Sequence, residues 1–294
     1  HRLPGSGVTA MERMLGALVA DASVSGAVVR GAADVAVTGV VFDSRRITPG
    51  CLFCCVRGSN SDGHSFAPAA KAAGAAALVV DHLLDVDLPQ VVVPDTRVAM
   101  GPLASAFFGN PSHSLVMVGV TGTNGKTTTT TLLASVLESA GMPTGVIGTL
   151  TGKHTTPEGP DLQEQLAGFL AAGKRAVVME VSSHALALHR VGGTRFDVAV
   201  FTNLGRDHLD LHGTVERYFA AKALLFEPAL SAHGVVNADD LHGRLLLDAA
   251  SIPMTGFSHT DLIDLDVTPV SHSYTWRGQR VQVHIGGQFN AMNS

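Results

Sequence analysis

Short apolar runs alternate with alanine-rich segments over the first third of the chain. Apolar runs of this length predict buried strands, and the alanine-rich segments predict helices. The expected strands are Val37–Asp43, Leu52–Val56, Ala77–Val80 and Gln90–Val93, and the expected helices are Phe66–Ala73 and Arg97–Phe108. The second helix runs into Gly109-Asn110-Pro111-Ser112, a loop-forming cluster that predicts a domain boundary.

From Ser114 the pattern changes to a regular succession of strand, loop and helix. Leu115–Val120 is a continuous apolar run, as in a strand that is buried on both faces of a parallel sheet. Further strands are expected at Gly145–Gly148, Ala176–Val181, Val198–Asn203 and Gly234–Asn237, with helices ending at Ala140, running from a cap at Asp161 to Gly173, and covering Val215–Leu225. This alternation predicts a doubly wound sheet with helices on both faces.

After Pro253 the pattern turns to antiparallel alternation, with a hairpin of Ser273–Trp276 and Val281–Ile285 around Arg277-Gly278. The predicted fold class is therefore α/β. A small N-terminal α/β domain covers residues 1–111, and a mostly parallel, doubly wound central domain with a short antiparallel extension covers residues 112–294. The chain stops at Ser294 without a terminal signal, which we interpret as a truncation.

Composition and charge restrict the class of protein. The 294 residues are 46% hydrophobic, which is enough to build full cores and excludes a disordered chain. Twenty basic against 25 acidic residues leave a net charge of −5, which argues against a broad nucleic-acid-binding surface. The longest apolar stretch is far shorter than the roughly 20 residues of a membrane span. We expect a cytoplasmic monomer that neither binds nucleic acid nor inserts into a membrane.

The three cysteines are crowded into Cys51-Leu-Phe-Cys54-Cys55. A C-x-x-C pair is compatible with zinc binding or thiol redox chemistry, but no second pair follows at zinc-ribbon spacing. Because the neighbouring residues are apolar, we interpret all three as core cysteines.

The strongest chemical signal is Gly122-Thr123-Asn124-Gly125-Lys126-Thr127-Thr128, placed between an expected strand and an expected helix. Phosphates require backbone N–H donors without obstructing side chains, a helix N-terminus, a lysine, and a hydroxyl for Mg²⁺, and this segment offers all four. The usual phosphate-binding loop has a glycine five residues before Gly125, where this chain has Val120. The alternative is a glycine-rich turn with an incidental lysine.

Three further segments carry candidate chemistry. Glu180 ends an apolar strand and is either a Mg²⁺ ligand or a structural acid. Asp207-His208-Leu-Asp210-Leu-His212 is either a metal site or a polar loop with helix caps. Lys222 lies among apolar neighbours, where it either extends to water or is buried enough to act as a neutral amine.

In this order, these motifs resemble the Mur ligases, the ATP-dependent amino-acid ligases of peptidoglycan precursor synthesis, and among them the MurE type. The resemblance extends from about Val41 to Asn293. Besides the GTNGKTT loop it rests on Phe42-Asp-Ser-Arg45, Gly50-Cys-Leu-Phe53, Thr155-Thr-Pro157, Met179-Glu-Val-Ser-Ser-His-Ala-Leu186, His189-Arg190, Phe196-Asp197, Thr202-Asn203, Asp207–Gly213 and Gly287-Gln-Phe-Asn290. The family's own loop is the shortened GTxGK[TS] form, which accounts for Val120.

The resemblance implies roles for individual residues. ATP would contact Gly122, Thr123, Asn124, Gly125, Lys126, Thr127 and Thr128, and its adenine side would meet Asn290 and Asn293. Thr127, Glu180 and His208 would hold Mg²⁺, and Lys222 would be carbamylated, so that the catalytic set is Lys126, Glu180, His208 and Lys222. The uridine diphosphate end would contact Phe42, Ser44, Ser59, Asn60 and Ser61, and the muramoyl-dipeptide would contact Thr155, Thr156, Ser182 and Arg190.

The resemblance also implies a reaction. The substrate UDP-MurNAc-L-Ala-D-Glu would be phosphorylated by ATP to an acyl phosphate, and the amine of meso-diaminopimelate or L-lysine would then displace phosphate. His154 and Leu188 depart from the polar residues of some family members, so part of the substrate contact is altered. The family's C-terminal domain, which recognises the incoming amino acid, is missing from this sequence. We therefore expect the 294-residue chain to bind the UDP-sugar-peptide but not to complete ligation.

Several alternatives differ in kind from this assignment. Folylpolyglutamate synthase and cyanophycin synthetase share the scaffold, but the Asp43-Ser-Arg45 and Gly50-Cys-Leu-Phe53 motifs argue against both. A regulatory GTPase would need an N-K-x-D motif, which Asn203-Leu-Gly-Arg does not supply. A serine hydrolase would need a G-x-S-x-G elbow, which is absent around Ser182. A non-catalytic fragment that only binds the UDP-sugar-peptide remains as a further alternative.

Overall fold

The computed structural model describes residues 11–58, 61–152, 154–205 and 212–294. The chain forms two compact units. The first contains residues up to Pro111 together with Glu158–Ala167 and Val191–Thr194, and the second contains Ser112–Pro157, Gly168–Arg190 and Arg195–Ser294. Within the described part of the chain, no helix combines the length and the apolar character that a membrane crossing requires.

The first unit is built on a five-stranded sheet in the order β2-β7-β6-β5-β4. Its strands are β2 (Val28–Arg30), β4 (Gly39–Val41), β5 (Cys51–Cys54), β6 (Ala77–Val80) and β7 (Gln90–Val92), and a separate pair joins β1 (Arg13–Met14) to β3 (Ala36–Val37). Its helices are α1 (Leu15–Ala22), α2 (Ala67–Ala72) and α3 (Thr96–Phe107), with short 3₁₀ turns η1 (Ser44–Arg46) and η2 (Gly63–Phe66). Strands β4 to β7 are parallel, and only β2 pairs antiparallel, with β7.

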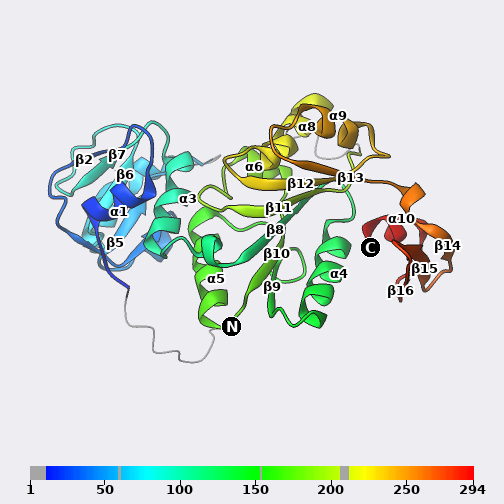
Figure 1. The fold of residues 1–294 in the computed structure, drawn as a ribbon. Coiled ribbons are helices and arrows are strands. Elements are labelled where there is room, and N and C mark those ends of the chain that lie inside the picture. Colours follow the sequence, from blue (N-terminus) through cyan, green and yellow to red (C-terminus); the bar gives the residue numbers. More distant parts are fainter. Residues whose placement is uncertain (1–10, 59–60, 153, 206–211) are drawn as a thin grey trace. The chain divides into compact units, whose positions relative to one another are not determined.

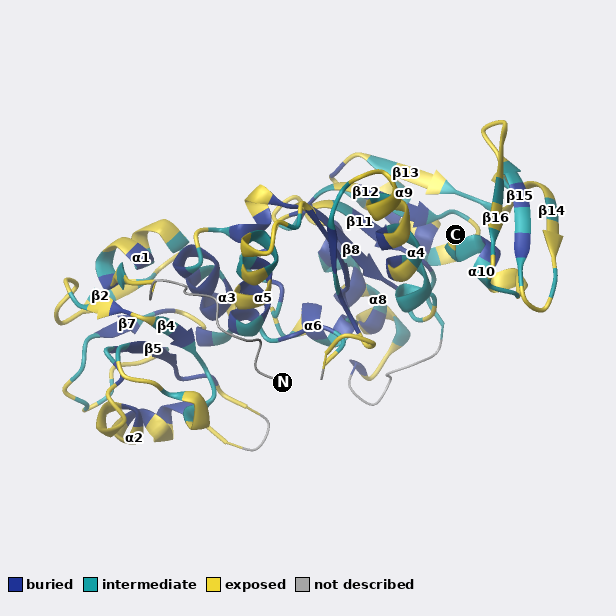
Figure 2. Cartoon of the chain, turned by 90° about the horizontal axis from the view of Figure 1, so that it is seen from below, coloured by how far each residue is buried: buried dark blue, intermediate teal, exposed yellow. Residues whose placement is uncertain are grey.

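Alternation along β5 places successive side chains on opposite faces of this sheet. Leu52 and Cys54 pack with α1 and α3, whereas Cys51 and Phe53 pack with α2. Figure 2 shows α1 and α2 on opposite sides of the strands. All three cysteines are buried and free, as expected for core residues.

The second unit contains a parallel six-stranded sheet in the order β13-β12-β11-β8-β10-β9, which confirms the predicted α/β class (Figure 1). Its strands are β8 (Val116–Thr121), β9 (Thr144–Ile147), β10 (Ala176–Glu180), β11 (Phe196–Phe201), β12 (Ser231–Asn237) and β13 (Met254–Phe257). Its helices are α4 (Lys126–Ser139), α5 (Gly159–Ala171), α6 (Ser183–Ala187), α8 (Val215–Ala223) and α9 (Leu241–Ala249), with 3₁₀ turns η3 (Pro111–Ser114), η4 (Leu224–Phe226) and η5 (His259–Asp261). Most of α5 (residues 159–167) and the first residue of η3, Pro111, belong to the first unit.

Strand β8 lies at the point where the order of the sheet reverses. The chain passes from β8 to β9 and β10 on one side and to β11 and β12 on the other. In doubly wound sheets, ligands bind outside the carboxyl ends of the strands at this switch point. The loop that follows β8 is therefore in the position where a phosphate site is expected.

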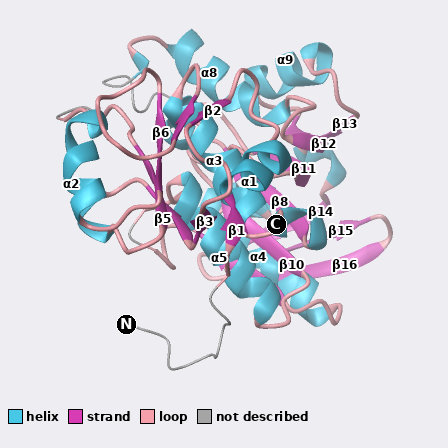
Figure 3. Ribbon diagram, turned by 90° about the vertical axis from the view of Figure 1, so that its left-hand side faces the viewer, coloured by secondary structure: helices cyan, strands magenta, loops and turns pink. Residues whose placement is uncertain are grey.

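Antiparallel structure begins later than the sequence predicts. The sequence predicts antiparallel structure directly after Pro253, but β13 (Met254–Phe257) pairs parallel with β12, because α9 supplies the crossover connection between them. The antiparallel sheet consists of β14 (Ile263–Val267), β15 (His272–Trp276) and β16 (Gln279–Val283), drawn in magenta in Figure 3, and is followed by α10 (Gln288–Asn293). The β15–β16 turn has positive φ at both Arg277 and Gly278, as tight hairpin turns require.

Candidate functional site

The loop between β8 and α4 depends on two glycines with left-handed backbone geometry. Gly122 has φ 147° and Gly125 has φ 89°. A Cβ on Gly122 would collide with the Thr202 hydroxyl, and a Cβ on Gly125 would collide with the side chain of Asn293. Both positions therefore exclude other residues for steric as well as conformational reasons.

The strand-end residues of β11 hold this loop from behind. Asn203 accepts from the Asn124 N–H (3.0 Å) through its Oδ1, and its Nδ2 donates to the Asn124 carbonyl (3.1 Å). The Thr202 hydroxyl donates to the same carbonyl (2.6 Å). The Thr123 hydroxyl accepts from the Gly205 N–H (2.8 Å). These bonds fix the loop backbone before any ligand is present.

Two lysines point at one carbonyl of the loop. The Nζ atoms of Lys126 and Lys222 each lie 2.8 Å from the Gly122 oxygen, and Lys126 also donates to the Thr123 carbonyl at 2.9 Å. Lys222 comes from α8, is 1% exposed, and lies 4.4 Å from the centre of the Tyr218 ring. Of the two alternatives for Lys222, the structure has the buried one, and the amines of both lysines lie beside the loop.

Glu180 lies at the end of β10 and is buried. Its carboxylate accepts from the Thr127 hydroxyl (3.0 Å) and from the Thr149 N–H (2.9 Å). Two oxygen ligands suited to Mg²⁺, the Thr127 hydroxyl and the Glu180 carboxylate, are thus adjacent. Thr149 was not identified from the sequence. It follows β9, and only the adjacency of β9 and β10 in the sheet brings it to Glu180.

One cavity of about 370 Å³ joins these groups. It is lined by Thr123, Asn124, Gly125, Lys126, Thr127, Thr128, Thr149, Thr155, Glu180, Ser182, Ser183, Tyr218 and Lys222. Most of the residues expected to bind ATP or to act in catalysis therefore meet at the carboxyl ends of β8 and β10. Ser183 and Tyr218 are further lining residues that the sequence patterns do not single out.

The remaining expected contacts of the second unit lie beside the cavity rather than in its lining. Thr156 is buried, donates to the Glu180 carbonyl (2.9 Å) and accepts from the Ser182 N–H (3.1 Å). Arg190 donates to the Thr156 carbonyl at 3.2 Å. Ser182, which does line the cavity, also caps α6 by accepting from Ala185 N–H. Thr156 and Arg190 therefore shape the segment that carries Glu180 and Ser182.

Helix α10 lies beside the start of α4. The Thr129 hydroxyl donates to the Asn293 carbonyl at 3.2 Å, and the Asn293 side chain faces Gly125. Asn290 donates to the Gly286 carbonyl at 2.7 Å. Asn293 is thus adjacent to the loop, on its helix side.

Some expected residues lie in the first unit or outside the described residues. Phe42 packs partly buried against the core beside α1 and α3, and Ser44 begins η1. Ser61 is exposed and its carbonyl accepts from Gly58 N–H. Ser59, Asn60 and His208 lie outside the described residues.

His212, from the same motif as His208, is described and buried. Its Nε2 lies 3.1 Å from the Ser183 hydroxyl, and its ring packs 5.2 Å from that of Tyr218. This part of the motif therefore reaches the wall of the cavity through Ser183 and Tyr218.

A parallel α/β sheet with a glycine loop, a lysine and a hydroxyl at the switch point defines the class of phosphate-binding-loop proteins. Comparison with known families narrows the class. The model of the Mur ligase middle domain matches residues 120–294, and the model described as Mur ligase family, catalytic domain, matches residues 36–108. The chain belongs to the Mur ligase family, which confirms the resemblance.

Two curated proteins and one solved structure illustrate the similarity within this family. The UDP-N-acetylmuramyl-tripeptide synthetase of Roseiflexus sp. (strain RS-1) is 40% identical over 88% of this chain and 58% of its own length. The UDP-N-acetylmuramoyl-L-alanyl-D-glutamate–2,6-diaminopimelate ligase of Geobacillus thermodenitrificans is 51% identical over 65% of this chain and 41% of its own. A solved structure with the latter enzyme name superimposes with a TM-score of 0.76 at 31% identity, over 87% of this chain and 57% of that one. The chain spans about half the length of these relatives.

Proposed function

We propose that this chain is part of an ATP-dependent ligase that extends UDP-MurNAc-L-Ala-D-Glu by a diamino acid, meso-diaminopimelate or L-lysine, in peptidoglycan precursor synthesis. The observation that carries the proposal is the single cavity in which Lys126, Thr127, Glu180 and Lys222 meet at the switch point of the sheet. The names of the relatives support the choice of substrate.

In this proposal the loop Gly122–Thr128 binds the phosphates of ATP. The N-terminus of α4 and the Lys126 ammonium offset the phosphate charge. In the structure Lys126 donates to two loop carbonyls, which provide a resting position from which it turns to a phosphate. Asn293, next to Gly125, and Asn290, one helical turn earlier in α10, are assigned to the adenine side.

Mg²⁺ fits the donor set of this cavity. The Thr127 hydroxyl and the Glu180 carboxylate lie 3.0 Å apart, and both offer the hard oxygen ligands that Mg²⁺ prefers. His208 is the third proposed ligand. When bound, Mg²⁺ would neutralise charge on the phosphates. Thr149 orients Glu180 through its N–H, so the carboxylate needs no rearrangement to face Thr127.

Lys222 is the proposed site of carbamylation. Only a neutral amine reacts with CO₂, and the Lys222 side chain is withdrawn from bulk water, with 1% of its surface exposed. Its amine lines the cavity 2.8 Å from the Gly122 carbonyl, so a carbamate there would lie next to the loop that is proposed to hold phosphate.

The two units are assigned separate roles. The predicted N-terminal domain, residues 1–111, would bind the UDP end through Phe42, Ser44 and Ser59–Ser61. The predicted central domain, residues 112–294, would bind ATP and, through Thr155, Thr156, Ser182 and Arg190, the peptide. The D-glutamyl carboxylate would attack the γ-phosphorus of ATP, releasing ADP and forming an acyl phosphate. The amine of the incoming diamino acid would then attack the acyl carbon and release phosphate, with loss of a proton. The protein's contribution to both steps is positioning and charge neutralisation.

The phosphate assignment is tested by calorimetric titration with ADP and Mg²⁺. Lys126→Ala removes a charged hydrogen bond, whose contribution of about 1.5–3 kcal/mol corresponds to a roughly 10–100-fold loss of affinity. Lys174→Ala is the matched control, because Lys174 pairs with Glu138 at the surface (3.1 Å) and does not line the cavity. Equal affinity of the two variants would contradict the assignment.

A further inference from the structure

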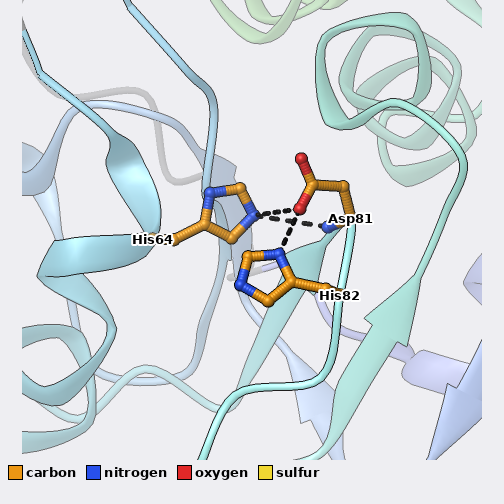
Figure 4. Close-up of side chains that lie close together, drawn as sticks. All are labelled: His64, Asp81 and His82. Carbon is orange, nitrogen blue, oxygen red and sulfur yellow. Dashed lines mark hydrogen bonds and ion pairs between the residues drawn. The ribbon is translucent and has the colours of Figure 1, made fainter.

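A second cluster of ligand-type side chains lies in the first unit and has no part in the proposed reaction. His64 comes from η2, and Asp81 and His82 directly follow β6. One ligand atom from each lies within 4.8 Å of the other two. Figure 4 shows both imidazole rings directed at the Asp81 carboxylate. His64 Nε2 lies 3.2 Å from Asp81 Oδ1, and His82 Nδ1 contacts the same oxygen.

The His64 ring is held in one orientation. Its Nδ1 lies 2.6 Å from Asp62 Oδ1, an oxygen that can only accept when ionised. Its Nε2 lies 3.3 Å from the Asp81 nitrogen and faces Asp81 Oδ1. His64 is 6% exposed and stacks on His82 with ring centres 4.9 Å apart. A carboxylate behind the imidazole of a metal ligand is the usual arrangement in metal sites.

Asp81 is oriented by Arg57. The Arg57 Nε donates to Oδ2 at 3.0 Å and its Nη2 donates to Oδ1 at 3.4 Å, and Oδ1 also faces the two imidazoles. Asp81 thus offers a carboxylate oxygen at the point where the two imidazole rings converge.

We propose that His64 Nε2, Asp81 Oδ1 and His82 Nδ1 form a binding site for a late first-row divalent ion of the Zn²⁺ type, with water completing the coordination. Two imidazoles and one carboxylate suit Zn²⁺ and not Mg²⁺. Ligands about 2.1 Å from a tetrahedral ion are about 3.4 Å apart, close to the 3.2 Å between His64 Nε2 and Asp81 Oδ1. His82, half exposed, has the freedom to open its short contact with Asp81 to this spacing.

The site would join η2 to the end of β6, two segments 17 residues apart in the chain. Binding to the folded chain alone would stabilise the first unit by mass action. This role is independent of the proposed ligase reaction, so either proposal can fail without the other.

The proposal is tested by titrating the 294-residue chain with Zn²⁺ in calorimetry, with excess Mg²⁺ present, and by the visible spectrum of the Co²⁺ form. His82→Ala is the main variant, because His82 is exposed and its loss does not disturb the core. Asp62→Asn weakens the hydrogen bond behind His64, for which about a 10–100-fold loss of affinity is expected. His259→Ala is the matched control, since His259 pairs with Asp239 (2.9 Å) outside the cluster.

We expect the wild-type chain and His259→Ala to bind one Zn²⁺ with equal affinity, His82→Ala to bind at least about tenfold more weakly, and the Co²⁺ form to show the intense absorption of a four-coordinate site. Unchanged affinity of His82→Ala would overturn the proposal, because Zn²⁺ would then be bound by other histidines. A weak, six-coordinate Co²⁺ spectrum would overturn it as well. Far-UV circular dichroism confirms that each variant is folded.

Discussion

Replacing Gly148 by alanine tests the role of the Glu180 carboxylate without changing either Glu180 or the loop. Gly148 follows β9 and is not among the residues with positive φ, so its backbone accepts alanine. A Cβ at this position would lie 2.9 Å from both Cγ and Cδ of Glu180, and closer still to Oε1. The added methyl group therefore acts directly on the side chain that is proposed to bind Mg²⁺.

The size of the effect follows from these distances. Ordinary contact begins at 3.4 Å, so Glu180 must move by about 0.5 Å at Cγ and Cδ and by about 1 Å at Oε1, the atom that accepts from the Thr127 hydroxyl. Overpacking of this kind costs about 1–3 kcal/mol of stability. If the displacement of Glu180 weakens Mg²⁺ binding by roughly 1.4 kcal/mol, the increase in ADP affinity that Mg²⁺ provides becomes about tenfold smaller.

The assay is calorimetric titration with ADP, once with Mg²⁺ and once with a chelator. We expect Gly148→Ala to lose most of the increase in affinity that Mg²⁺ gives the wild-type chain, while its affinity for Mg²⁺-free ADP is unchanged. Gly168→Ala in α5 is the matched control, because a Cβ there meets no atom within 4 Å. If Gly148→Ala retains the full effect of Mg²⁺, the placement of the metal at Glu180 is refuted.

Three further predictions concern the fold. Hydrogen bonds from Arg45 lower the pKa of Asp43 from 3.8 to about 2. The ionised Asp43 carboxylate therefore contributes fully to stability above pH 3.8, and this contribution is lost as the pH falls through 2. In urea denaturation, the free energy of unfolding of Asp43→Asn should decrease less over this pH range than that of the wild-type chain. Burial raises the pKa of Cys55 to about 12, so thiol reagents should modify the cysteines rapidly only after unfolding, and rapid reaction of the native chain would contradict their burial. Thr202→Val removes the 2.6 Å bond to the Asn124 carbonyl, which keeps its bond from Asn203, and should cost about 0.5–1.5 kcal/mol in the same denaturation assay.

The phosphate loop and the strand that carries Glu180 are predictable from sequence because their signals are local. Gly122 and Gly125 lie directly between a continuous apolar run and a helix, and the structure gives both left-handed geometry. Glu180 is recognisable because it is the only charged residue of β10 and ends that otherwise apolar strand.

Contacts made across the sheet are not predictable in this way. Thr149 reaches Glu180 only because β9 is the neighbour of β10, and the order of strands in a sheet cannot be predicted from local sequence patterns. Tyr218 enters the cavity from α8, where its side chain is indistinguishable in sequence from a core aromatic.

Helix α9 is not predicted from the sequence, and this omission also explains why the segment that forms β13 is predicted to be antiparallel. Asp240 caps α9 by accepting from two N–H groups, and this cap followed by leucines was a usable helix signal. Without that helix, no crossover is expected that could make β12 and β13 parallel neighbours, so the sequence predicts antiparallel structure after Pro253. The alternation of β15 and β16 was correctly predicted because both flank a two-residue turn.

We propose that this chain binds UDP-MurNAc-L-Ala-D-Glu and that the D-glutamyl carboxylate of this ligand is activated by ATP. Calorimetric titration with UDP-MurNAc-L-Ala-D-Glu, compared with UDP-MurNAc-L-Ala, tests it most directly, because the two ligands differ only in the D-glutamyl residue that would be phosphorylated. We expect UDP-MurNAc-L-Ala-D-Glu to bind more tightly than UDP-MurNAc-L-Ala. Failure to bind either ligand would contradict the assignment of the first unit, and equal binding of both would contradict the proposed substrate.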